Sequence, residues 1–123
     1  MPWLEPAREL AAIACRLPGV ETLRLRVGPK EVLGRARDLG ASRRRRDEAG
    51  RRRLRRLIAF VDRYLPFGPS CYRRVALEIA LDAGAAQETA FMGVRVGGGP
   101  RSGHVWLASE GEPLERYDAS FEV

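Results

Sequence analysis

The stretch that decides the fold is RYLPFGPSCYRRVALEIALDAG, residues 63 to 84. Its loop PFGPS interrupts a helix, because the two prolines lack a backbone N–H and restrict the residues before them. Ser70 is a preferred N-cap, which predicts that a new helix begins at Cys71. Gly84 is a typical helix stop. Four apolar residues are expected to form the buried face of this helix, namely Val75, Ala76, Ile79 and Ala80.

The segment before the loop carries much of the positive charge. Residues 46–65 have apolar residues at one-, three- and four-residue steps, which predicts a helix with one buried stripe. The stripe consists of Leu54, Leu57, Ile58, Val61 and Leu65. The opposite face is arginine-rich and includes Arg52, Arg55 and Arg56. That face is either simply solvated or a docking surface for an acidic peptide or a partner protein.

The N-terminal part is expected to be helical. Residues 4–17 form an amphipathic pattern that ends at PGV, and residues 28–40 suggest a shorter helix with proline at its start. Between them, residues 21–27 alternate like a strand and are equally consistent with an extended linker. Residues 1–45 are therefore interpreted as a helical N-terminal region.

The C-terminal part changes period. Residues 88–98, 104–109 and 114–123 are β-rich and separated by turn residues, which predicts an antiparallel meander. Helices followed by strands indicate an α+β fold with a small antiparallel sheet. Residues 46–123 are expected to form its core, within one compact domain.

Composition limits the class of protein. The chain has 123 residues and a net charge of +6, and all its basic residues except Lys30 are arginines, a bias that GC-rich coding also produces. No aromatic residues interleave the arginines, which disfavours nucleic acid as a partner. No apolar run is long enough to span a membrane, and no secretory signal is recognised. We expect a cytoplasmic protein without a metal or organic cofactor.

Cys71 has two interpretations. A thiol in the first turn of a helix lies at the positive end of the helix dipole, which favours the nucleophilic thiolate. Free cysteines are also commonly buried packing residues, and Cys15 is expected to be one. The two cysteines belong to no metal-binding pattern, although they could form a disulfide. A nucleophile would need a base, and His104 is the only histidine.

A hairpin register suggests a partner for that histidine. If Gly111 is the centre of the turn, His104 faces Asp118 on the next strand. Opposite residues have Cβ atoms about 4.5–5.5 Å apart, so the carboxylate could orient the imidazole. Glu115 would point to the other face. The sequence thus predicts a set of Cys71, His104 and Asp118, typical of cysteine peptidases.

The motifs around these residues resemble those of the leader peptidases of lasso-peptide biosynthesis, which are transglutaminase-like cysteine peptidases. The resemblance covers about residues 55–120 and depends on Cys71 with Arg74 three positions later, on the GVR at residues 93–95, and on His104 with a tryptophan two positions later. It implies a transglutaminase-like or papain-like core. It also implies that Cys71, His104 and Asp118 are the catalytic triad. Tyr72 and GHVW at residues 103–106 depart from the commoner residues.

The resemblance also implies a substrate and partners. The substrate would be a ribosomally made precursor peptide, cut between leader and core. The length suggests the stand-alone form of the peptidase, which needs a separate small leader-recognition protein, and the ring-closing cyclase is a further expected partner. Arg74, Arg52, Arg55 and Arg56 are candidate contacts for the substrate or partner. Two alternatives remain: a non-catalytic peptide-binding adaptor that retains the fold, and a basic nucleic-acid-binding module.

Overall fold

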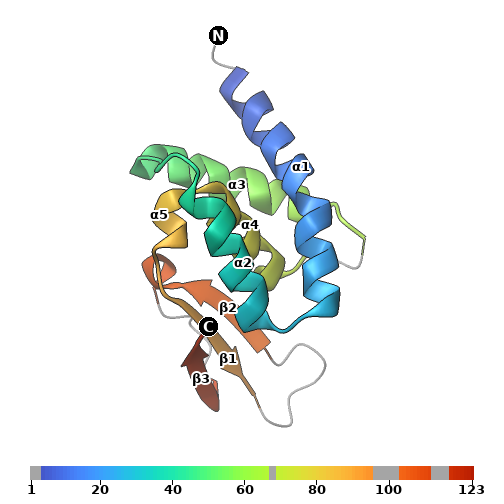
Figure 1. Cartoon of the computed structure of the whole chain (residues 1–123), viewed down its shortest axis with the longest axis vertical. Helices are drawn as coiled ribbons and strands as arrows, with labels where there is room; N and C mark the ends of the chain where they lie inside the picture. Colours follow the sequence, from blue (N-terminus) through green and yellow to red (C-terminus); the bar gives the residue numbers. More distant parts are fainter. Residues whose placement is uncertain (1–3, 67–68, 96–102, 112–116) are drawn as a thin grey trace.

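The computed structural model describes residues 4–66, 69–95, 103–111 and 117–123. Helices and strands follow one another in the order α1 (Leu4–Arg26), α2 (Pro29–Ala41), α3 (Glu48–Arg63), α4 (Cys71–Leu81), α5 (Ala83–Ala86), β1 (Ala90–Val94), β2 (Gly103–Leu107) and β3 (Ala119–Glu122). A short 3-10 turn, Ala108–Glu110, follows β2. The expected α+β class, helices followed by a small antiparallel sheet, is confirmed (Figure 1).

Helix α4 is the centre of the molecule. It packs against α1, α2, α3 and β2, and all its residues from Val75 to Leu81 are buried (Figure 1). The hydrophobic core joins residues from α1 to β2, so helices from residues 1–45 share it with the rest of the chain. Gly40 allows α2 to approach α4 closely, because a Cβ there would lie 1.9 Å from the carbonyl oxygen of Ile79. In the described part of the chain, no helix is long and apolar enough to cross a membrane.

Helix α1 is longer than the sequence predicts. It continues from Leu4 through Pro18 to Arg26, so the expected stop after residue 17 is wrong, and residues 21–27 are almost entirely helical, neither strand nor linker. One proline removes a single N–H donor from the helix. The burial of Val20 against the core favours continuation over a break. The Thr22 hydroxyl also donates to the Pro18 carbonyl oxygen at 2.8 Å.

Helices α3 and α4 follow the sequence prediction closely. Asp47 caps α3 by accepting a hydrogen bond from the backbone N–H of Gly50. Leu54 and Ile58 of the predicted stripe are buried, and the other stripe residues pack beside them or lie partly buried. The stop of α4 is earlier than expected, because Asp82 leaves the helix and caps the short helix α5.

The sheet has a different strand order from the predicted meander. β1 lies in the middle and pairs antiparallel with both β2 and β3. The predicted hairpin register, in which His104 faces Asp118, is therefore wrong: His104 faces Gly93, and Gly93 faces Ser120. The partly buried, apolar β1 takes the central place, while the fully exposed β3 takes an edge. Glu115, which that register placed on the other face, lies outside the described residues.

Candidate active site

A buried carboxylate fixes the loop that precedes Cys71. Asp62, fully buried near the end of α3, accepts a hydrogen bond from the backbone N–H of Ser70 at 2.9 Å. It also accepts one from Nε of Arg73 at 2.6 Å, and Arg73 is itself 2% exposed. A buried charge pair is stable only when its hydrogen bonds are satisfied. Asp62 therefore ties the end of α3 to the start of α4.

Cys71 is the first residue of α4, as predicted. Ser70 precedes it in extended conformation, and its hydroxyl accepts a hydrogen bond from the backbone N–H of Arg73 at 3.2 Å. The half-buried Cys71 Sγ accepts a hydrogen bond from the backbone N–H of Val105 at 3.4 Å. Val105 is in β2, an edge strand, so this N–H points away from β1. This contact holds the sulfur against the edge of β2.

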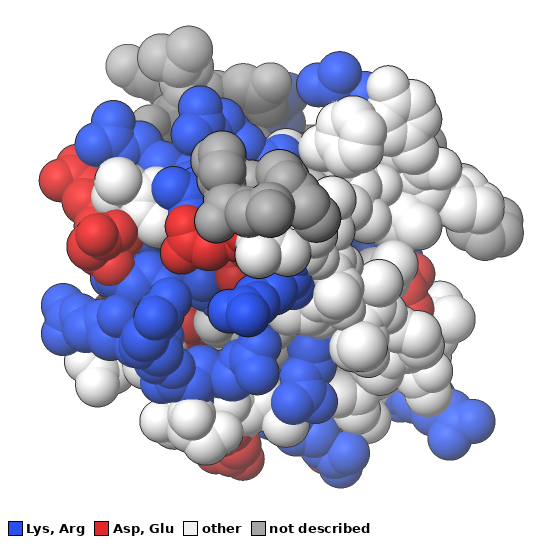
Figure 2. All heavy atoms as spheres, turned by 90° about the horizontal axis from the view of Figure 1, so that it is seen from above, with Lys and Arg blue, Asp and Glu red and all other residues white. Residues whose placement is uncertain are grey.

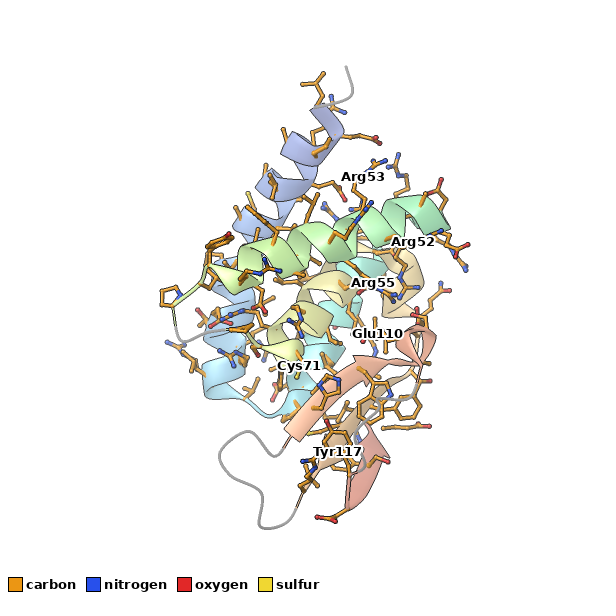
Figure 3. The ribbon with its side chains drawn as sticks, turned by 180° about the vertical axis from the view of Figure 1, so that it is seen from behind. Arg52, Arg53, Arg55, Cys71, Glu110 and Tyr117 are labelled. Carbon is orange, nitrogen blue, oxygen red and sulfur yellow. The ribbon has the colours of Figure 1, made fainter. Side chains whose placement is uncertain are left out.

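Cys71 and His104 line the same cavity. Its volume is about 190 Å³, and its walls come from α3, α4, β2 and the 3-10 turn. Figure 3 shows Cys71 at the start of α4, between α3 and the sheet, with Glu110 nearby. The other lining residues are Arg55, Ile58, Ala59, Arg74, Val75, Glu78 and Val105. The structure thus brings together a thiol, the only imidazole of the chain and several charged groups.

Aromatic rings hold the imidazole of His104 in place. Its ring stacks beside Trp106 at 5.7 Å and beside Tyr117 at 6.2 Å between centroids. Gly93 faces His104 across the sheet, and a Cβ at Gly93 would lie 2.6 Å from the Tyr117 ring. The missing side chain therefore makes room for Tyr117. Arg95 covers this ring with its guanidinium 5.4 Å from the centroid, which is a cation–π contact.

Asp118 occupies a different position from the one that the hairpin predicted. It precedes β3, its side chain is exposed, and its backbone N–H donates to the carbonyl oxygen of Val94 at 3.0 Å. β1 separates β3 from β2, so the backbones of His104 and Ser120 are about 10 Å apart, twice the usual strand spacing. Asp118 does not line the Cys71 cavity. Its role as the orienting acid stays a prediction.

The far wall of the cavity is charged. Glu78, almost fully buried, accepts hydrogen bonds from Arg51 at 2.8 Å and from Arg55 at 2.9 Å. Partial burial, and then the negative charge of Glu78, raise the pKa of Glu110 above its usual value, although Arg55 and Arg74 oppose this. The wall therefore offers a polar surface beside the thiol.

The predicted docking arginines fall into two groups. Arg55 and Arg74 line the cavity, and both are already paired, Arg55 with Glu78 and Arg74 with Asp62 at 3.5 Å. Arg52 and Arg56 are exposed on α3 and line a neighbouring hollow together with Arg55. Arg55 and Arg74 therefore lie beside Cys71, whereas Arg52 and Arg56 do not line this cavity.

Sequence reasoning missed Asp62, Tyr117 and Glu110. Asp62 could have been found, because it follows Ile58 by four residues and is an acid on the apolar stripe of α3. Tyr117 depends on the strand order, and Glu110 on the 3-10 turn, neither of which has a local signal. The expectation that Cys15 is a packing residue is wrong, because its side chain is exposed. Both cysteines are free thiols.

Comparisons of the chain with protein-family models, with curated proteins and with solved structures found no match. The site is therefore judged on its own geometry.

Proposed function

We propose that this protein is a cysteine peptidase that removes the leader from a ribosomally made lasso precursor peptide. The observation that supports it best is the single cavity lined by both Cys71 and His104, with the Val105 N–H directed at the sulfur. The motif resemblance around the same residues supplies the substrate class. A transglutaminase-like core is part of the same proposal, and the helix-start cysteine packed against the histidine strand is consistent with it.

The chemistry follows from these groups. His104 takes the proton of the Cys71 thiol, and the thiolate attacks the carbonyl carbon of the scissile bond. Ser70 already accepts the backbone N–H of Arg73, so the N–H of Cys71, which has no acceptor within the helix, is the proposed donor to the developing oxyanion. The protonated His104 gives its proton to the leaving amine, and a thioester remains on Cys71. Water, deprotonated by His104, then attacks the thioester, releasing a carboxylate and regenerating the thiol.

A third catalytic group would orient the imidazole, and Asp118 is the proposed candidate. Asp118 lies two residues before Ser120, and Ser120 pairs with Gly93, the residue that faces His104. The stacked rings of Trp106 and Tyr117 restrict the same imidazole. Asp118→Asn is therefore expected to lower the cleavage rate less than the loss of Cys71 does.

The test is cleavage of a precursor peptide encoded beside the gene, with and without a neighbouring leader-recognition protein and the cyclase, followed by mass spectrometry. We expect the wild-type protein to release the leader, and Cys71→Ala and His104→Ala to abolish release. Cys15→Ala is the matched control, because Cys15 is an exposed thiol on α1, and it should cleave normally. Cleavage by Cys71→Ala at the wild-type rate would refute the peptidase and favour a non-catalytic peptide-binding adaptor.

A further inference from the structure

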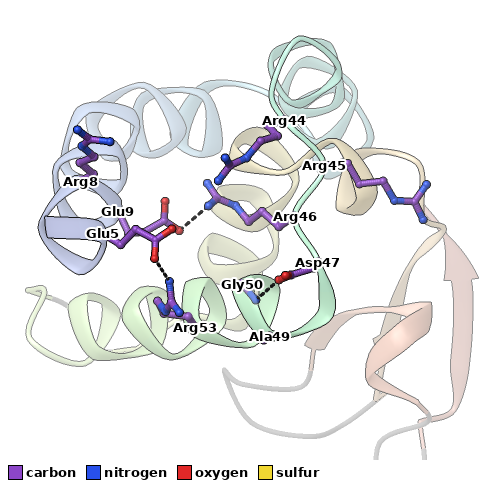
Figure 4. Close-up of a pocket in the computed structure, with 10 residues that line it drawn as sticks. All are labelled: Glu5, Arg8, Glu9, Arg44, Arg45, Arg46, Asp47, Ala49, Gly50 and Arg53. Carbon is purple, nitrogen blue, oxygen red and sulfur yellow. Dashed lines mark hydrogen bonds and ion pairs between the residues drawn. The ribbon is translucent and has the colours of Figure 1, made fainter. Parts of the chain in front are cut away.

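A large hollow lies away from Cys71. It has a volume of about 560 Å³ and lies between the start of α1, the segment before α3 and the first turn of α3 (Figure 4). Its wall carries five arginines and three acidic residues. Figure 2 shows that basic side chains gather over one part of the surface, with a few acidic ones among them, whereas another part is mostly uncharged.

The acidic residues of this hollow are already engaged. Glu9 pairs with Arg46 at 2.7 Å, and Glu5 pairs with Arg53 at 2.8 Å (Figure 4). Asp47 is the N-cap of α3 and accepts the hydrogen bond of the Gly50 N–H at 2.7 Å. The carboxylates thus neutralise two arginines and cap one helix.

Three arginines of the hollow remain uncompensated. Arg8, Arg44 and Arg45 are exposed, and none forms an ion pair with any residue that the structure describes. Figure 4 shows Arg8 on α1 and the other two on the segment that leads into α3. A concave surface with unpaired guanidinium groups favours carboxylate ligands, because the guanidinium fork matches them in geometry and charge.

Shared lining residues relate this hollow to the cavity of Cys71. A second hollow shares Arg45, Arg46 and Asp47 with it and extends over α3 to Arg55. Arg55 also lines the Cys71 cavity. In Figure 3, Arg53 lies on the side of α3 toward α1, and Arg55 lies on the side toward Glu110 and Cys71.

We infer that this path, which we call the arginine groove, binds an acidic segment of the peptide whose scissile bond lies at Cys71. The arginine groove is defined by Arg8, Arg44, Arg45, Arg52 and Arg55. The binding surface is argued from charge and shape alone, whereas its role in docking the substrate rests on the proposed function. Gly50 and Ile58, which line the two ends on α3, are about 12 Å apart along the helix axis, and the path also passes around the helix, so more than about four extended residues are needed to cover it.

The observations favour a peptide over a nucleic acid. The carboxylates of Glu5, Glu9 and Asp47 interrupt the positive surface, a pattern that suits the spaced acidic side chains of a peptide better than the evenly spaced phosphates of a nucleic acid. Aromatic side chains on which bases could stack are missing among the described residues that line the hollow.

The test is binding of a fluorescein-labelled peptide with glutamates separated by uncharged residues, measured by fluorescence anisotropy on the Cys71→Ala protein so that no cleavage occurs. We expect binding that weakens with added salt, and no binding of the same peptide with glutamines. The double variant Arg44→Glu, Arg45→Glu should bind at least about tenfold more weakly, because charge-assisted hydrogen bonds are lost. Both arginines are exposed and unpaired, so the variant should keep the wild-type circular dichroism spectrum.

The double variant Arg26→Glu, Lys30→Glu is the matched control, since it changes the net charge by the same amount and both residues are exposed near the opposite end of α1. An equal loss of binding in this control would overturn the inference, because net charge alone would then explain it. Displacement of the peptide by a single-stranded oligonucleotide at lower concentrations than by unlabelled peptide would also overturn it. If the glutamate peptide binds as expected while Cys71 proves inert, only the peptidase proposal fails. If leader cleavage occurs but the glutamate peptide does not bind, only the arginine groove fails.

Discussion

The two ends of helix α3 use the same charged residue types in opposite ways. At its C-terminal end, Asp62 is fully buried and paired with Arg73, which is 2% exposed. At its N-terminal end, Glu48 and Arg52 are 88% and 68% exposed and lie 3.6 Å apart. The buried pair anchors the loop of the candidate nucleophile, whereas the exposed end borders the arginine groove.

The difference teaches that burial, not arginine content, separates structural from available charge. A buried pair loses hydration that only its partner replaces, so removal of one member strands the other. An exposed pair is screened by water and salt, so its members are free to bind something else. The same helix can therefore carry a structural clamp and a binding surface.

The largest expected effect comes from breaking the buried end. Asp62→Ala should lower the free energy of unfolding by about 3 kcal/mol, because Arg73 is left buried without its main partner. Glu21 lies 3.4 Å from Arg73 and still pairs with it, so the loss is expected at the low end of the range for a broken buried ion pair, about 3–5 kcal/mol. Urea unfolding measures the loss, and a change below about 1 kcal/mol would contradict the clamp.

An intermediate effect is expected where Arg51 and Arg55 of α3 contact Glu78 of α4. Glu78→Gln keeps the shape of the side chain but removes the charge that Arg51 and Arg55 share, and both arginines are partly exposed. We expect a loss of about 1.5 kcal/mol in urea unfolding. A loss as large as that of Asp62→Ala would mean that partial exposure does not weaken these pairs.

Among the ion pairs, the exposed pair of Glu48 and Arg52 at the N-terminal end of α3 should contribute least to the free energy of unfolding. Glu48→Ala removes a surface pair and one acidic residue from the first turn of α3, and about 0.5 kcal/mol or less should be lost. High salt should shrink even this difference. If Glu48→Ala matches Asp62→Ala in the same urea titration, the contrast between the two ends is wrong.

The smallest effect concerns pH. The pKa of Glu110 is raised, mainly by partial burial and then by Glu78, so the folded protein binds this proton more tightly than the unfolded chain does. The stabilisation is therefore present in acid and is lost as the pH rises through the raised pKa. Glu110→Gln should match the wild type near pH 4 and be slightly more stable near pH 7. A variant that is less stable than the wild type at neutral pH would show the opposite sign.

Local patterns were enough to predict much of the helical part. The stop at PFGPS, the cap at Ser70 and the stripe of α3 depend on residues close in sequence, and their predictions are confirmed. For α1, the prediction that the helix ends before Pro18 was wrong. The burial of Val20 stabilises the continued helix by more than the one hydrogen bond lost at Pro18 destabilises it.

The sheet and part of the site could not be predicted in this way. A hairpin between β2 and β3 was the simplest pairing, but strand order is decided by which strand fits the centre of the sheet. The neighbours of His104 follow from that order, because Tyr117 lies beside it only where β3 pairs with β1. The shared cavity with Cys71 depends in turn on how β2 packs against α4.

The central claim is that Cys71 is a nucleophile activated by His104. The rate at which iodoacetamide alkylates Cys71 tests this claim most directly. Mass spectrometry can follow Cys71 and Cys15 in the same sample, so the exposed Cys15 serves as an internal reference. Near pH 6.5, we expect Cys71 to react at least roughly tenfold faster than Cys15, and His104→Ala to remove that advantage. A Cys71 that reacts no faster than Cys15, or whose rate does not change in His104→Ala, would contradict the claim.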